Sequence, residues 1–67
     1  MSVPLLIGLM MSNPSGVPPT ATLMTKRALW QRWYDAATDH TYLRHWADGG
    51  WQLTVYVGNV VPSCCRD

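Results

Sequence analysis

Residues 29–57 read LWQRWYDAATDHTYLRHWADGGWQLTVYV and set the architecture expected of this chain. They include all four tryptophans and all three tyrosines among the 67 residues. Aromatic and β-branched residues suit a pleated, half-buried surface, and two turn signals divide the segment. The sequence therefore predicts an all-β fold, a small three-stranded antiparallel meander.

The second turn signal is Asp48-Gly49, which lies between two aromatic-rich runs. Asp tolerates a positive φ and Gly has no Cβ to clash, so the pair suits a type I′ hairpin turn. We expect a positive φ at Gly49. A two-residue loop here sets the register of the hairpin, with the expected cross-strand pairs Trp46–Trp51, Arg44–Leu53 and Tyr42–Val55.

The first turn signal is the run from Asp35 to Asp39, where the Asp35 side chain can accept bonds from nearby backbone donors. A four-residue loop would place Trp33 of a first strand, residues 30–35, opposite Tyr42. One predicted face then carries Trp33, Tyr42, Trp46, Trp51, Leu53 and Val55. The other carries Trp30, Arg32, Tyr34, Leu43, His45, Thr54 and Tyr56.

A helix over residues 22–37 is an alternative for the region before the hairpin. Leu29, Trp30, Trp33, Tyr34 and Ala37 also recur at helical spacing. The hairpin from Tyr42 to Val57 is expected with either choice.

Size and charge limit the class of protein. A chain this short buries only about 60% of its unfolded surface, and a staple or a partner commonly completes such domains. The net charge is +1, and Lys26-Arg27 with Arg32 is the main basic cluster. A nucleic-acid surface needs more clustered positive charge, so we expect no nucleic-acid partner.

Residues 1–11, MSVPLLIGLMM, are apolar but shorter than the roughly 20 residues that cross a bilayer. They lack the basic start of a signal peptide, and we expect no membrane role. We interpret them as an arm that packs on a neighbouring subunit; packing on the chain's own sheet is the alternative. Residues 12–20, SNPSGVPPT, predict an extended linker with polyproline character.

The groups able to carry chemistry do not converge in the sequence. Cys64 and Cys65 are adjacent, a spacing that disfavours a disulfide, and two reduced thiols are expected. His40 and His45 lie five residues apart, so on one strand they would face opposite sides and make a poor zinc pair with the cysteines. We expect no metal, no cofactor and no enzymatic activity.

The run from Trp33 to Leu53 resembles a short β-meander found in structural proteins of tailed phages. The matching residues are Trp33, Asp35, Thr38, Tyr42, Trp46, Asp48-Gly49 and Trp51, with a proline-containing lead-in at residues 13–20. Asp39 stands where that pattern has glycine. The resemblance implies a virion component, such as a capsid decoration, a fibre or a tail-attached module.

A second resemblance is to WW domains, which are also three-stranded meanders. It is carried by Trp30, Asp35, Thr38, Tyr42 and Trp51. It implies a groove for proline-rich peptides, with Tyr42 and Trp51 as the gripping pair. The displaced histidine, His45, and the distant Pro62 depart from the WW pattern.

Three regions follow from these arguments: an arm and linker at 1–24, the meander at 25–61 and a tail at 62–67. We expect a structural subunit of a viral particle, present in the virion and in the host cytoplasm during assembly. Its partners would be capsid or tail proteins, with further copies of itself as an open alternative. The candidate partner-binding residues are Leu5, Ile7, Leu9, Met10, Trp30, Tyr34, Tyr42 and Trp51.

Overall fold

The computed structural model describes residues 13–66. The strands in this range form one antiparallel sheet. Its strands are β1 (Thr22–Lys26), β2 (Trp30–Asp35), β3 (His40–Ala47) and β4 (Gly50–Val57), in the order β1-β2-β3-β4. The predicted all-β meander is therefore confirmed, with four strands rather than three. The additional strand, β1, begins inside the region expected to be linker.

The helical alternative for residues 22–37 is wrong. Burial alternates along β2, where Gln31, Trp33 and Asp35 are buried and the residues between them are half-buried. Between β1 and β2 the chain reverses, and the Arg27 N–H donates to the Trp30 carbonyl at 2.8 Å. Alternating burial belongs to a strand, because successive side chains point to opposite faces.

Both turns have the expected loop lengths. Ala47 pairs with Gly50, which leaves Asp48 and Gly49 as a two-residue loop with φ of 54° and 76°. Positive φ at both central residues is the geometry of a type I′ turn. Asp35 pairs with His40 around a four-residue loop that ends on Asp39, whose φ is 57°. Asp39 thus adopts the left-handed conformation that glycine takes most easily.

The expected register and faces are confirmed. Trp33 pairs with Tyr42, Tyr42 with Val55, and Trp46 with Trp51. We call the side of the sheet that carries Trp33 and Tyr42 face A, and the opposite side, with Leu43, face B.

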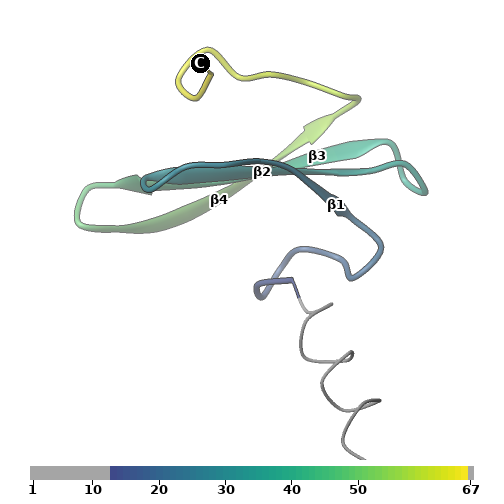
Figure 1. The fold of residues 1–67 in the computed structure, drawn as a ribbon, viewed down its shortest axis with the longest axis horizontal. Coiled ribbons are helices and arrows are strands. Elements are labelled where there is room, and N and C mark those ends of the chain that lie inside the picture. The colour runs from purple at the N-terminus through teal and green to yellow at the C-terminus, as the bar shows by residue number, and fades with distance from the viewer. Residues whose placement is uncertain (1–12, 67) are drawn as a thin grey trace, which may run out of the picture.

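Residues 13–21 cover part of face A, while the tail after β4 lies over face B (Figure 1). A hydrophobic cluster joins Val17 and Ala21 from this N-terminal segment to Trp33 and Tyr42 of the sheet. The sheet is thus covered on both sides by segments from opposite ends of the described chain.

The N-terminal segment is folded, so the expected extended linker is wrong at residues 13–20. The Val17 N–H donates to the Pro14 carbonyl and the Ala21 N–H to the Pro18 carbonyl, both at 3.0 Å, which closes two successive turns. Gly16, with a φ of 90°, occupies the third position of the first turn, where a type II turn requires a positive φ. The Asn13 amide ties the turns together through bonds to the carbonyls of Pro18 and Ala21.

The tail is held to face B through a buried threonine. The Thr41 hydroxyl donates to the Gly58 carbonyl at 2.5 Å and accepts from the Val60 N–H at 3.0 Å. Leu43, which follows Thr41 on the same face of β3, is completely buried. These contacts complete the second small core, on the side of the sheet away from Trp33.

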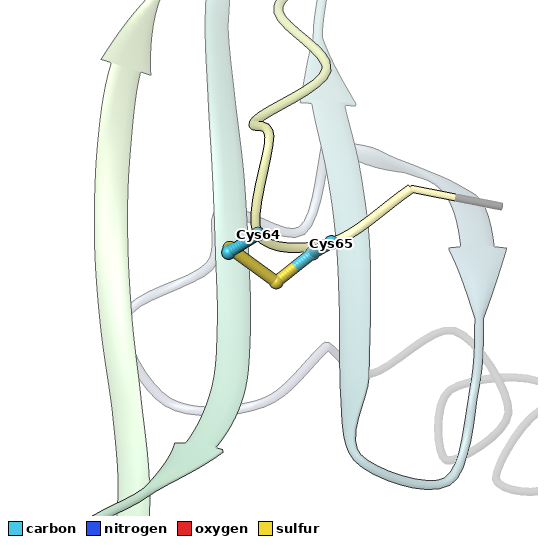
Figure 2. Close-up of a disulfide and its surroundings, with 2 residues drawn as sticks. All are labelled: Cys64 and Cys65. Atoms are coloured by element: carbon cyan, nitrogen blue, oxygen red, sulfur yellow. A yellow bond between two sulfur atoms is a disulfide. The ribbon is translucent and has the colours of Figure 1, made fainter.

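Cys64 and Cys65 form a disulfide, so the expectation of two reduced thiols is wrong. A bond from the Cys65 N–H to the Pro62 carbonyl, 3.1 Å long, closes a turn that includes both cysteines. The disulfide lies over β2 and β3 (Figure 2), and Cys65 is buried. The turn and its packing on the sheet together place the adjacent sulfurs in bonding contact.

Candidate interaction surface

A row of apolar side chains on face A is left uncovered by the N-terminal segment. These side chains come from β4 and the adjoining end of β3, and they are between 41% and 80% exposed. We call this row the β4 patch: Trp46, Trp51, Leu53, Val55 and Val57. Contiguous exposed apolar surface of this kind marks sites of contact with other molecules.

Ring contacts hold together the end of the β4 patch at the hairpin tip. The rings of Trp46 and Trp51 meet edge to face, with centroids 5.4 Å apart and planes at 80°. The Arg44 guanidinium lies 4.2 Å from the centroid of the Trp51 ring, a cation–π contact. Arg44 also donates to the Gln31 side-chain oxygen at 3.3 Å, so a residue of β2 helps to position the cation.

An open groove adjoins this tip on face A. Its volume is about 560 Å³, and its walls mix polar and apolar side chains. It lies where the N-terminal segment meets the sheet, lined by Asn13, Pro14, Leu23, Lys26, Gln31, Trp33 and Arg44. The groove and the β4 patch therefore flank the covered part of face A.

The predicted partner-binding aromatics do not form one site. Trp30 and Tyr34 are half-buried on face B, whereas Tyr42 and Trp51 lie on face A. Tyr42 is buried in the Val17 cluster, while Trp51 is exposed at the hairpin tip. The four arm residues, Leu5, Ile7, Leu9 and Met10, lie outside the described residues.

Two carboxylates organise the first turn. Asp35 accepts bonds from the hydroxyls of Thr38 (2.8 Å) and Thr20 (2.9 Å), which hold the pKa of its carboxyl below the ordinary value. The Tyr34 hydroxyl donates to Asp39 at 2.5 Å, and this bond raises the pKa of the tyrosine. The Thr20 bond also fixes the N-terminal segment to the sheet, so these groups have a structural use.

The histidines stay apart, as their spacing indicates. His40 makes an edge-to-face contact with Tyr42 on face A, with centroids 6.4 Å apart, whereas His45 pairs with Trp30 and Gln52 on face B. Across residues 13–66 no group of three or more His, Cys, Asp or Glu side chains is placed to hold a metal ion. Within the same residues, no helix is long and apolar enough to cross a membrane.

Comparison with known proteins identifies no relative of this chain. No family model, curated protein or solved structure matches this chain. Its function is therefore inferred from the surfaces of the chain itself and from the motif in its sequence.

Four members of the β4 patch, Trp46, Leu53, Val55 and Val57, were not among the predicted partner-binding residues. Their position on face A follows from the alternation along the two strands of the hairpin. The missing information was which half of face A the N-terminal segment would cover. The sequence did contain one sign that β4 is open to a partner, because β4 contains no charged residue and no proline.

Proposed function

We propose that this chain is a non-enzymatic structural subunit of a viral particle, acting through protein–protein contacts as a capsid decoration, fibre or tail-attached module. The observation that carries the proposal is the β4 patch, an exposed apolar row on the half of face A that the N-terminal segment does not cover. Burying such side chains stabilises an assembly by roughly 1.5–3 kcal/mol for each one that becomes fully covered.

The viral setting is supported by the aromatic motif between Trp33 and Leu53. The turn geometry is consistent with that motif, since Asp39 and Gly49 both have positive φ where the pattern has its turns. The chain would act in the virion, and in the host cytoplasm while particles assemble. Its partners would be capsid or tail proteins or further copies of itself.

The arm supplies a second contact in this proposal. Leu5, Ile7, Leu9 and Met10 would bind another chain, and the folded segment at residues 13–21 would anchor the arm to its own sheet. That anchor is specific, because Asn13 and Thr20 bond to the segment and to Asp35 respectively. Burying these four large apolar side chains against another chain would stabilise the assembly by roughly 1.5–3 kcal/mol for each one that becomes fully covered.

The WW-like alternative has less support from the arrangement of aromatics. A groove for a proline-rich peptide needs two accessible aromatic walls close together. Tyr42 is buried, and it pairs with Val55, four residues along β4 from Trp51. Titration with proline-rich peptides separates the two functions, since only a WW-like module would bind them.

The direct test is to quantify this chain in particles purified from cells that encode it. Density-banded particles are digested, and peptides of this chain are measured by mass spectrometry against a major capsid protein. We expect a fixed ratio that persists after a high-salt wash, since apolar contacts are little weakened by salt. Recovery of the chain only in the soluble fraction, with none in banded particles, would overturn the proposal.

A further inference from the structure

We infer that β4 pairs edge to edge with β4 of a second copy of this chain, about a two-fold axis through Thr54. This inference rests on the proposed function, because it names the partner of one of the surfaces through which a structural subunit acts. Four features carry it: the free backbone groups of β4, their register, the side chains beside them and the contrast with the other edge of the sheet.

The first feature is the set of backbone groups that β4 leaves unpaired. Among residues 13–66, β4 is the last strand of the sheet and bonds only to β3. Just beyond it, the Gly58 N–H donates inward to the Asp39 carbonyl at 2.7 Å. Inward and outward groups alternate along an antiparallel strand, so the residues with outward N–H and C=O groups are Trp51, Leu53, Val55 and Val57.

The two-residue turn leads to the same result from the other end of the hairpin. Ala47 and Gly50, which flank a type I′ loop, exchange both ladder bonds. Counting from Gly50, every second residue of β4 bonds inward, and the residues between them bond outward. The four outward residues are also the four β4 members of the β4 patch, so one row offers both backbone groups and apolar side chains.

The second feature is a register that satisfies all of these groups at once. With Thr54 opposite Thr54 of the second copy, Leu53 faces Val55 and Trp51 faces Val57 in both directions. All four outward residues of each copy then form hydrogen-bonded pairs, and two bonds per pair saturate the edge. Such an interface is isologous, the commonest kind in protein dimers.

The third feature is the match of side chains in this register. On face A the bulky Trp51 ring of one copy would lie beside Val57 of the other copy. Val57 is smaller and is 80% exposed in the single chain. β4 carries no charged residue, so no like charges meet across the axis. On face B the axis brings two threonines together, a favourable cross-strand pair. Both faces of the joined sheet are therefore compatible with a second copy.

The fourth feature is the contrast between the two edges of the sheet. β1 has five residues, ends in Lys26 and is interrupted by a bulge between Leu23 and Thr25. Short length, a lysine and a bulge are devices that prevent pairing at a sheet edge. β4 has eight residues and none of these devices. The chain thus protects the β1 edge and leaves the β4 edge open, which favours strand pairing at β4.

Cysteine cross-linking tests the pairing in the full-length chain. In the proposed register, Thr54 lies opposite its own copy at a non-hydrogen-bonded position, where Cα atoms are about 4.5 Å apart and within disulfide range. Thr54→Cys should therefore give a covalent dimer under mild oxidation. Peptide mapping that finds the two substituted positions linked to each other distinguishes this dimer from exchange with Cys64 and Cys65.

Gln52→Cys is the matched control. In the same register Gln52 faces Tyr56 of the second copy, and the two Gln52 positions lie about 14 Å apart along the strands. We expect at least about a tenfold lower yield of cross-linked dimer from this variant, because that distance exceeds disulfide reach. Equal yields from the two variants, or no dimer from Thr54→Cys, would overturn the inference.

A second measurement does not depend on cysteine chemistry. Sedimentation equilibrium of the unmodified chain over about 1–500 µM should show a monomer–dimer equilibrium. Val55→Lys should weaken it at least about tenfold by placing charge in the interface, while Leu23→Lys, an exposed residue of face A at the protected edge, should not. Circular dichroism confirms that both variants fold. A monomer throughout, or a dimer equally weakened by both variants, would contradict pairing at β4.

These outcomes are independent of the particle test. A chain that is absent from particles, but whose Thr54→Cys variant forms the symmetric cross-linked dimer, would refute the viral function and leave the pairing intact. A chain that is present in particles without the dimer would refute the pairing alone, and an unidentified partner or residues 1–11 would then be the occupant of β4.

Discussion

Leu53 lies against Gly16, at the border between the covered and open halves of face A. A Cβ built on Gly16 would come within 2.6 Å of Leu53 Cδ2. Gly16 also has a φ of 90°, which side-chain-bearing residues rarely adopt. This contact marks the border of the area that the N-terminal segment covers on face A. The other side chains of the β4 patch lie outside that area and are exposed.

Replacing Gly16 by alanine should loosen the N-terminal segment. The Leu53 side chain can move aside, but the positive φ still costs about 1–3 kcal/mol for a residue with a Cβ. Urea unfolding followed by tryptophan fluorescence measures the loss, because Trp33 lies beneath this segment. Ser15→Ala, at an exposed neighbouring position, is the control and should change stability by less than about 0.5 kcal/mol. Equal stability of the two variants would show that the turn does not depend on glycine.

The hairpin turn offers a comparison between adjacent glycines. Gly49 has a φ of 76°, whereas Gly50 has no positive φ, and neither position is crowded. Gly49→Ala should therefore lower the free energy of unfolding by about 1 kcal/mol or more through backbone strain alone. Gly50→Ala should be close to neutral. Thermal unfolding of both variants measures the difference, and a reversed order would contradict the type I′ geometry.

Acid should destabilise the fold through Asp35. The bonds from Thr38 and Thr20 lower the pKa of this carboxyl in the folded chain below its ordinary value of 3.8. The stabilisation is therefore present above the unfolded pKa and is lost as pH falls below it towards the folded pKa. Unfolding measured from about pH 6 down to pH 2 should show this decline, and Asp35→Asn should flatten it. An unchanged slope in the variant would assign the acid sensitivity to other groups.

Thr41 should be essential for holding the tail. Its buried hydroxyl donates to the Gly58 carbonyl and accepts from the Val60 N–H. Thr41→Val keeps the shape but leaves two backbone groups without a partner, at a cost of about 1–3 kcal/mol. Thr54→Val, a half-buried position on the same face, is the control. Hydrogen exchange at Val60 reports on the tail directly, and protection equal to that of the unmodified chain would show that other contacts suffice.

The hairpin was predictable from the sequence because local rules determine it. Asp48-Gly49 sets the loop length, and period-two alternation then places every side chain from Tyr42 to Val57 on its face. β1 was not predictable in this way. Its bulge between Leu23 and Thr25 interrupts the alternation, and a proline-rich run precedes it.

The covers over the two faces depend on contacts distant in sequence. Thr20 bonds to Asp35, and Thr41 bonds to Gly58 and Val60. Composition and periodicity do not reveal such bonds, so the sequence predicts an extended linker where the N-terminal segment is folded. For the same reason the sequence indicates that face A is apolar but not that its β4 half is left uncovered by the N-terminal segment.

The most direct test of the structural-subunit account is the incorporation of a chain that lacks residues 1–11. Particles are assembled in cells that produce the truncated chain in place of the full one, and its copies per particle are measured by quantitative mass spectrometry. Circular dichroism of the purified truncated chain establishes that the sheet is retained. The account predicts that a folded, truncated chain is absent from purified particles, because the apolar arm supplies a contact that the sheet alone does not. Incorporation at the full-length copy number would contradict it.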